Sequence, residues 1–129
     1  MPSQVEVGLD TIGQIAVPVQ DLARAVAFYR DTLGMQFLFQ VPNMAFFDCS
    51  GIRLMLGLPE SPEEAGPASI IYFKVADIQA TFEAFEQRGT NFIAAPHLVA
   101  DMPDHELWMA FFQDSEANTL ALMSEVPKS

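Results

Sequence analysis

At 129 residues, the chain has the usual length of one domain, and its 50% hydrophobic content indicates a folded core rather than a disordered segment. Seventeen acidic residues against six basic ones give a net charge of −11, which would repel the phosphates of nucleic acids and an acidic membrane surface. No apolar run approaches the roughly 20 residues of a membrane span, and the N-terminus lacks the pattern of a secretory signal, so we expect a cytoplasmic protein.

The first half of the chain predicts a strand, a helix and three more strands. Residues 12–19 alternate and are rich in β-branched side chains, which is typical of a strand. A helix is expected over residues 21–34, with Asp21 as its N-cap and Gly34 as its stop. Three strands are then expected over residues 35–41, 44–49 and 51–58, followed by a linker rich in Pro, Glu and Gly over residues 59–68.

The second half repeats this order. A strand is expected over residues 69–75 and a helix over residues 77–89, with Asp77 as the N-cap and Gly89 as the stop. Further strands are expected over residues 90–95, 107–114 and 118–126, and the segment DSEAN is expected to form the turn between the last two.

The two halves are also similar in sequence, which indicates an internal duplication. VPVQDLARAVAFY aligns with FKVADIQATFEAF, so that Asp21 corresponds to Asp77, and DCSGIRLML aligns with DSEANTLAL. We therefore predict an α+β fold of two βαβββ modules, about residues 11–58 and 69–126 of a single domain. The modules are expected to form a curved, cup-shaped mixed sheet with the helices on its outer face.

Two segments carry a resemblance to a known family. IAVPVQDLARAVAFYRDTLGM resembles the opening of the vicinal oxygen chelate family, and FFQDSEANTLALMSE resembles its last strand. That family includes glyoxalase I, bleomycin-resistance proteins and extradiol dioxygenases. The resemblance covers roughly residues 11–126 and implies the paired βαβββ fold. It does not imply one reaction, because the family includes isomerases, dioxygenases, thiol transferases and drug-binding proteins.

The resemblance also implies where the metal ligands of metal-dependent members would lie. The four positions fall on Gln14, Met55, Ile70 and Ala121. A catalytic divalent metal needs about three protein ligands with N, O or S donors, and neither Ile70 nor Ala121 has a donor atom. We therefore expect no metal and no other cofactor at these positions.

Without a metal, the cup is expected to be an apolar pocket for a small molecule. Arg53 is interpreted either as an arginine extended toward solvent at the rim or as a clamp for an anionic ligand. Tyr72 either donates a hydrogen bond into the cup or packs as an ordinary aromatic, and Phe46 and Phe111 are expected in the core. The alternation of the strands directs these side chains into the cup: Gln14, Ala16, Arg53, Met55, Ile70, Tyr72, Thr119, Ala121 and Met123.

Both histidines of the chain, His97 and His105, lie in one polar stretch that is expected to be a loop over the cup mouth. Three interpretations remain open: a structural loop, an acid–base lid in which His105 acts with Tyr72, and a relocated metal site that uses Gln14, His97 and His105. Trp108 is expected either to stack on a flat ligand or to anchor the core.

These observations favour a protein that binds a small organic molecule in a cup without the usual metal ligands. The alternatives are a metal-independent isomerase or lyase that uses His105, and a metal enzyme with relocated ligands, so catalysis stays open. A homodimer is expected, because the resemblance suggests one and edge strands need cover. The expected ligand-binding residues are Gln14, Arg53, Met55, Ile70, Tyr72, His97, His105, Trp108 and Ala121.

Overall fold

The computed structural model describes residues 7–61 and 68–128. Most of the predicted linker, residues 62–67, lies outside the described residues. The first half contains β1 (Gln14–Pro18), α1 (Leu22–Ala27), the π-helical turn η1 (Phe28–Thr32), β2 (Gln36–Val41), β3 (Met44–Cys49) and β4 (Ile52–Gly57). The second half contains β5 (Ile71–Lys74), α2 (Ile78–Gln87), β6 (Asn91–Phe92), β7 (His97–Asp101), β8 (His105–Gln113) and β9 (Thr119–Pro127).

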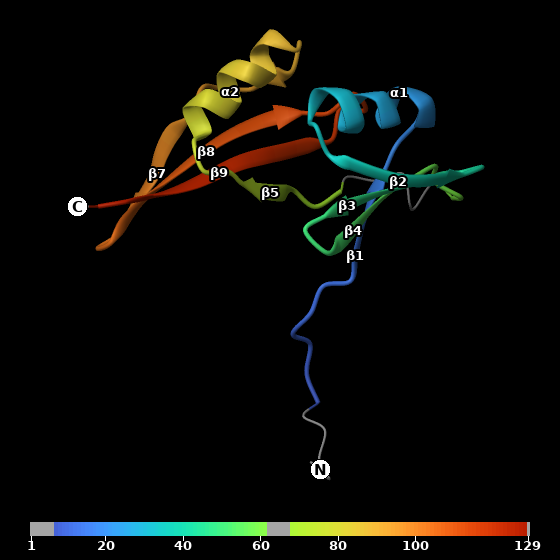
Figure 1. Cartoon of the computed structure of the whole chain (residues 1–129), viewed down its shortest axis with the longest axis horizontal. Coiled ribbons are helices and arrows are strands. Elements are labelled where there is room, and N and C mark those ends of the chain that lie inside the picture. The colour runs from blue at the N-terminus through green and yellow to red at the C-terminus, as the bar shows by residue number, and fades with distance from the viewer. Residues whose placement is uncertain (1–6, 62–67, 129) are drawn as a thin grey trace.

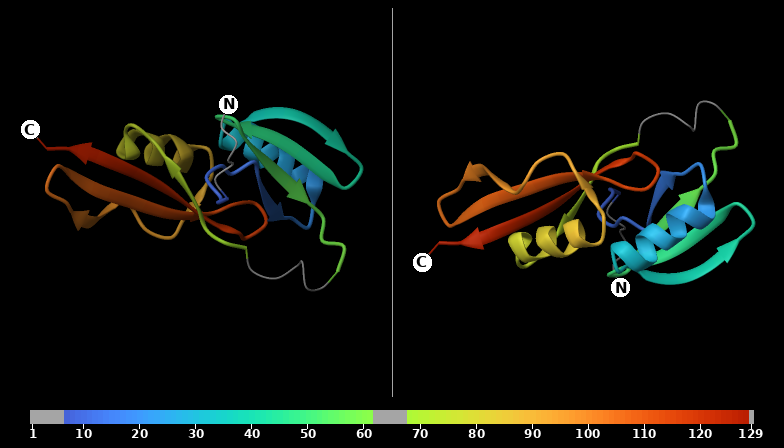
Figure 2. Two further views of the ribbon diagram at one scale, coloured as in Figure 1. Left: turned by 90° about the horizontal axis from the view of Figure 1, so that it is seen from below. Right: turned by 90° about the horizontal axis from the view of Figure 1, so that it is seen from above.

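The strands form two mixed sheets, one from each half of the chain, and these lie side by side (Figures 1 and 2). The first sheet has the order β1-β4-β3-β2, and the second has the order β5-β9-β8-β6 with β7 on β8. Equivalent parallel pairs join the first and last strands of each βαβββ unit, since Ile15 pairs with Leu54 and Ile71 pairs with Leu120. The predicted α+β fold and the duplication are thus confirmed, with the strands divided between two sheets.

Both helices begin where the sequence predicts, but the first is α-helical only to Ala27 and continues to Thr32 as the π-helical turn η1. The side chain of Asp21 accepts a hydrogen bond from the backbone of Arg24, and Asp77 accepts one from Ala80, each at 3.0 Å. Gly34 and Gly89 follow the helices with positive φ angles, a conformation that glycine adopts at little cost.

The helices cover only one face of the two sheets. Figure 1 shows α1 and α2 on the same side of the strands. The largest fully buried side chains belong to this layer and to the strand faces beneath it, and they include Tyr29, Phe47, Leu54, Leu56, Phe112, Leu120 and Leu122. The opposite face of both sheets, called the open face below, bears no helix from residues 7–61 and 68–128.

The histidine stretch differs from its prediction. Residues 97–101 form β7, which pairs antiparallel with β8, so that His97 lies opposite Met109 and Asp101 opposite Glu106. The expected loop is therefore a β-hairpin, with each histidine at the first position of a strand. No helix among residues 7–61 and 68–128 is long and apolar enough to cross a membrane.

Candidate functional site

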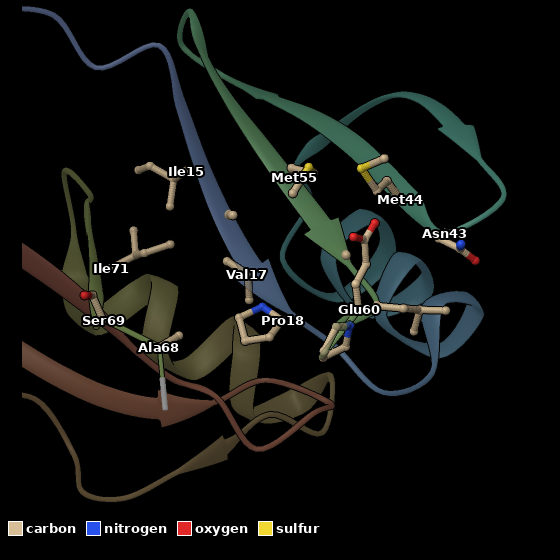
Figure 3. A pocket seen from close by; sticks show the side chains of 14 residues that line it. Ile15, Val17, Pro18, Asn43, Met44, Met55, Glu60, Ala68, Ser69 and Ile71 are labelled. Atoms are coloured by element: carbon tan, nitrogen blue, oxygen red, sulfur yellow. The ribbon is translucent and has the colours of Figure 1, made fainter. Parts of the chain in front are cut away.

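A hollow of about 520 Å³ lies on the open face of the first sheet, where β1, β3 and β4 meet the segment that leads into β5 (Figure 3). We call it the methionine hollow, because Met44 and Met55 lie on its sheet side. Its lining is Ile15, Ala16, Val17, Pro18, Asn43, Met44, Met55, Gly57, Leu58, Pro59, Glu60, Ala68, Ser69 and Ile71.

Small residues on neighbouring strands create this space. Ala16 pairs with Met55 across β1 and β4, and the next pair on the same face is Pro18 with Gly57. A Cβ atom at Gly57 would lie 3.5 Å from the Met55 methyl carbon and 3.8 Å from Met44 Cγ. Larger side chains at Ala16 or Gly57 would therefore occupy the hollow, and the flexible thioethers beside it can adapt to different ligand shapes.

Polar and aromatic groups continue the open face beyond the hollow. Gln14 pairs with Arg53 two residues before the Ala16–Met55 pair, on the same face of the sheet. The side-chain amide of Gln14 donates to Met55 Sδ at 3.8 Å. The guanidinium of Arg53 lies over the Phe46 ring, 5.7 Å from its centroid. Phe46 in turn stacks on the half-exposed Phe39 with the ring centroids 4.6 Å apart. The expectation that Phe46 lies in the core is wrong, because the face of β3 that carries it has no helix over it.

The structure brings together three of the predicted ligand-binding residues, Gln14, Arg53 and Met55, on the open face of the first sheet. Only Met55 lines the methionine hollow itself. Ile71, which the prediction did not include, lines the hollow in place of its neighbour Ile70.

A second group of predicted residues lies on the open face of the second sheet. Tyr72 pairs with Ala121, which it helps to bury, and its ring contacts Phe111 edge to face at 5.9 Å. The His97 ring lies 6.5 Å from the same Phe111 ring. Phe111 is only partly buried and is not among the residues that pack against the core cluster, so its expected place in the core is also wrong.

Trp108 lies on the opposite face from these residues. It packs against the core cluster, and its indole nitrogen donates to Glu106 at 3.2 Å. Strand alternation therefore directs it toward the helix layer rather than the open face. This packing agrees with the predicted role of core anchor, and Trp108 also lines a hollow of about 460 Å³ at the start of α2.

The two histidines are held apart by their strands. His97 lies opposite Met109, and His105 is four residues earlier on β8, which corresponds to about 13 Å along the strand. His105 lies at the end of the second sheet, where it pairs with Pro127, and Figure 1 places this end away from β1 and β4. The two imidazoles therefore do not converge on one site within this chain, as the relocated metal site would require.

His105 does have an acidic partner. Its Nδ1 atom lies 2.7 Å from Asp104 Oδ1, and the pKa of Asp104 is lowered mainly by this hydrogen bond. The Asp104 side chain is 87% exposed and that of His105 is 25% exposed, and the pair lies at the tip of the β7–β8 hairpin. His105 does not line the methionine hollow.

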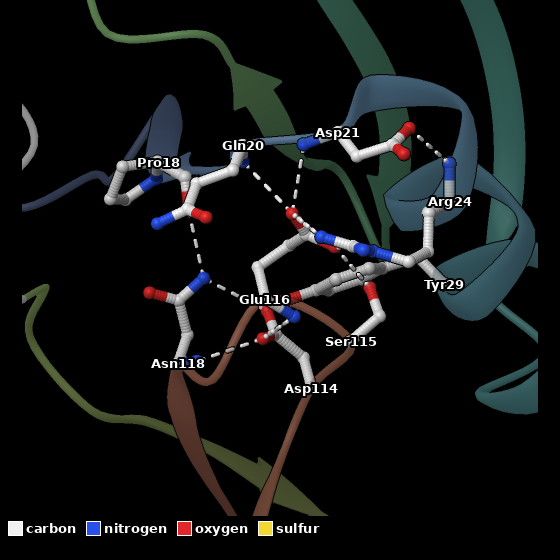
Figure 4. Close-up of polar contacts among 9 residues, drawn as sticks. All are labelled: Pro18, Gln20, Asp21, Arg24, Tyr29, Asp114, Ser115, Glu116 and Asn118. Carbon is white, nitrogen blue, oxygen red and sulfur yellow. Dashed lines mark hydrogen bonds and ion pairs between the residues drawn. The ribbon is translucent and has the colours of Figure 1, made fainter.

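The turn between β8 and β9 fastens the second module to the first beside the methionine hollow (Figure 4). Glu116 Oε1 accepts hydrogen bonds from the backbone N–H groups of Gln20 and Asp21, both at 2.9 Å, and Arg24 Nε donates to Oε2 at 2.8 Å. The side chain of Asn118 donates to the backbone oxygen of Pro18, which lines the hollow, at 2.9 Å.

The charges in this turn are well satisfied. The hydrogen bond from Arg24 is the largest cause that lowers the pKa of Glu116 to about 2, and the amides of Asp21 and Gln20 add to it. Tyr29 donates to Asp114 Oδ2 at 2.7 Å, and burial followed by the Asp114 charge raises the pKa of the Tyr29 hydroxyl. The sequence predicted only a turn here, because local pattern cannot identify a carboxylate whose partners lie in the other module.

The four positions that the resemblance implies as metal ligands do not fit a divalent ion. Gln14 offers one amide oxygen, Met55 offers a soft thioether, and Ile70 and Ala121 offer no donor atom. Elsewhere among the described residues, no group of three or more His, Cys, Asp or Glu side chains is placed to hold a metal ion.

Comparisons with known proteins place this geometry in context. The family model described as the Glyoxalase/Bleomycin resistance protein/Dioxygenase superfamily matches residues 11–122. A Glyoxylase-like domain-containing protein of Didymella fabae is 28% identical over 131 residues, which cover 91% of this chain and 95% of that protein.

Two solved structures show how widely this fold is used. Lactoylglutathione lyase from Agrobacterium tumefaciens has a TM-score of 0.73 and 20% identity, with coverage of 91% of this chain and 95% of its own. TnmS3, an antibiotic binding protein from Streptomyces sp. CB03234, has a TM-score of 0.70 and 21% identity, with coverage of 95% and 100%. One is a lyase and the other a binding protein, so the shared fold does not by itself select a function.

Proposed function

The chain belongs to the Glyoxalase/Bleomycin resistance protein/Dioxygenase superfamily, and on that premise we propose that it binds a small organic molecule in the methionine hollow. The observation that carries this proposal is the hollow itself, a space of about 520 Å³ with a largely apolar lining. Small-molecule sites typically have volumes of about 300–1,000 Å³ and apolar walls with a few polar groups.

The proposed activity is binding without the family's metal centre. The donor set at Gln14, Met55, Ile70 and Ala121 supports this, since only one of the four side chains has an oxygen or nitrogen donor. The chain would then resemble TnmS3, which is named as an antibiotic binding protein.

Binding is favoured over acid–base catalysis by the position of the histidines. Neither His97 nor His105 lines the methionine hollow, and His105 lies at the hairpin tip. A general base must come within hydrogen-bond reach of the proton that it removes. A ligand in the hollow would lie beyond the reach of His105, so we do not assign that residue a catalytic role.

We also propose that the chain forms a homodimer in the cytoplasm. The open face of the second sheet presents Tyr72 to solvent, 45% exposed, and Ile70, just before β5, is 39% exposed. A second copy would remove this surface from water, which is favourable for apolar groups. Sedimentation velocity at micromolar concentrations should give the mass of a dimer, and a mass that stays monomeric would contradict this assembly.

Titration with a neutral fluorescent probe tests the binding site. N-phenyl-1-naphthylamine is apolar and aromatic, and its emission rises on transfer from water to an apolar site. We expect it to bind the native protein, and we expect Ala16→Leu to weaken binding by about tenfold or more because the leucine occupies the hollow.

The matched control is Ala23→Leu, because Ala23 is an exposed residue of α1 on the helix side of the sheet. This variant adds the same side chain outside the hollow and should bind the probe within about twofold of the native protein. Equal affinity of the native protein and Ala16→Leu, or a native protein that does not bind the probe, would overturn the proposal.

A further inference from the structure

We infer that the natural ligand carries an anionic group, a carboxylate or a similar oxyanion, that is bound by Arg53 while the apolar body of the ligand occupies the methionine hollow. This inference rests on the proposed function, because it names the chemistry of the ligand of that same hollow. It also runs against the net charge of −11, which taken alone would favour a cationic ligand.

The position of Arg53 suits such a contact. It lies two residues before Met55 on β4, so the two side chains point to the same face about 7 Å apart along the strand. On β1 its partner is Gln14, which precedes Ala16 of the hollow in the same way. A ligand held between the two methionines would therefore meet Arg53 and Gln14 just beyond its end.

Arg53 differs from the other basic side chains of the chain. Among the residues that the structure describes, the Arg53 side chain has no hydrogen bond and no carboxylate partner, and its guanidinium lies over the Phe46 ring. The other five each have a polar partner: Arg24 on Glu116, Arg30 on Asp31, Lys74 on Glu125, Arg88 on the backbone oxygen of Thr32, and Lys128 on Asp101.

Arg53 has no carboxylate partner although a carboxylate lies directly opposite it on the neighbouring strand. Asp48 pairs with Arg53 between β3 and β4, yet its Oδ1 atom accepts from the backbone N–H of Gly51 at 3.1 Å. Arg53 lies over Phe46 instead. A guanidinium that has no carboxylate partner keeps its N–H donors for a ligand, and two of these donors in parallel match the two oxygens of a carboxylate.

Gln14 supplies a second donor beside the guanidinium. Its amide nitrogen contacts Met55 Sδ at 3.8 Å, and a thioether is a weak acceptor. An oxyanion near Arg53 would be a stronger acceptor for that N–H. The site therefore combines the Arg53 cation, the Gln14 amide, which can exchange its weak thioether acceptor for an oxyanion, and the adjoining apolar hollow. An amphipathic organic anion requires these groups.

Two probes that differ by one charge test the inference. 8-Anilinonaphthalene-1-sulfonate has the same aromatic body as N-phenyl-1-naphthylamine and adds a sulfonate, which represents the oxyanion. We expect Arg53→Gln to weaken sulfonate binding by about tenfold and to leave the neutral probe within about twofold. Retained binding of the neutral probe also shows that the variant is folded.

Arg30→Gln is the matched control, since it makes the same change in net charge on the helix side of the molecule, where Arg30 is paired with Asp31. It should leave both probes within about twofold of the native protein. Arg53→Lys should give an intermediate loss for the sulfonate, because it keeps the charge and loses the planar fork.

The outcomes separate the two proposals. Suppose that Ala16→Leu weakens the binding of both probes. If Arg53→Gln then weakens the binding of neither probe, or of both probes equally, the hollow stands as the site and the anion contact is overturned. If Ala16→Leu leaves both probes bound as before, the hollow is not the site, and both proposals are overturned.

Discussion

Tyr29 and Asp114, which belong to different modules, are joined by a hydrogen bond of 2.7 Å, and both residues are buried. Asp114 also accepts from the backbone N–H groups of Glu116 and Asn118, each at 2.8 Å. This buried carboxylate therefore shapes the β8–β9 turn and connects it to η1. Asn118 of the same turn donates to the backbone oxygen of Pro18 at the methionine hollow. The geometry of the hollow therefore depends on how the turn is held.

Tyr29→Phe should lower the free energy of unfolding by about 1–3 kcal/mol, because a buried acceptor loses one partner. Urea denaturation measures this change. The control is Tyr72→Phe, which removes a hydroxyl from a half-exposed ring and should change stability by less than about 0.5 kcal/mol. Equal effects of the two substitutions would contradict a specific role for the Tyr29–Asp114 bond.

The Glu116 carboxylate should make stability depend on acid pH. Its pKa is lowered to about 2 from an ordinary value of 4.5, so the unfolded chain binds a proton more readily than the folded one. The stabilisation is present above about pH 4.5 and is lost as the pH falls toward about 2. Glu116→Gln should flatten the pH dependence of the unfolding free energy over this window.

At neutral pH the same substitution should cost about 1 kcal/mol, a modest figure because the Arg24 partner is half exposed and water screens the pair. Glu86→Gln on the exposed side of α2 is the control and should keep the slope of the native protein. A Glu116→Gln protein with an unchanged slope would show that this carboxylate titrates alike in the folded and unfolded states.

Trp108→Phe should separate packing from ligand binding. Trp108 packs against the core cluster on the helix side, so the smaller ring should lower the free energy of unfolding by about 1–3 kcal/mol. The affinity for N-phenyl-1-naphthylamine should stay within about twofold. A loss of probe binding as large as that of Ala16→Leu would instead support stacking of Trp108 on the ligand.

Removal of metal should leave the protein unchanged. Dialysis against a chelator is expected to shift the melting temperature by less than about 1 °C. A metal bound to the folded state would stabilise it, and removal of that metal would lower the melting temperature. Zinc or manganese at one equivalent should have equally little effect. Saturable stabilisation by either ion that disappears in Gln14→Ala or His97→Ala would contradict our proposal that the protein binds its ligand without a metal.

The fold could be predicted from the sequence because its signals are local. Asp21 and Asp77 mark the starts of the helices, Gly34 and Gly89 mark their ends, and the alternation between them gives most strands. The duplication adds an internal check, since both halves had to give the same order of elements. The strand β7 escaped prediction because it is mostly exposed and has little alternation, so its residues resemble a polar loop.

The candidate site was predicted only in part. Gln14, Arg53 and Met55 were assigned to one face correctly, because strand alternation fixes that face. The hollow itself depends on Gly57, which is small, and on the segment before Ile71, and no local pattern shows that these meet. The two histidines were predicted together because they lie in one stretch of the sequence. The register of β7 and β8 holds them apart.

A crystal structure of the protein in complex with N-phenyl-1-naphthylamine would locate the binding site. We expect electron density for the probe between Met44 and Met55, over Ala16 and Gly57, with the β8–β9 turn still bonded to the start of α1. Density only on the open face of the second sheet, beside Tyr72 and Phe111, would contradict the assignment of the methionine hollow as the binding site.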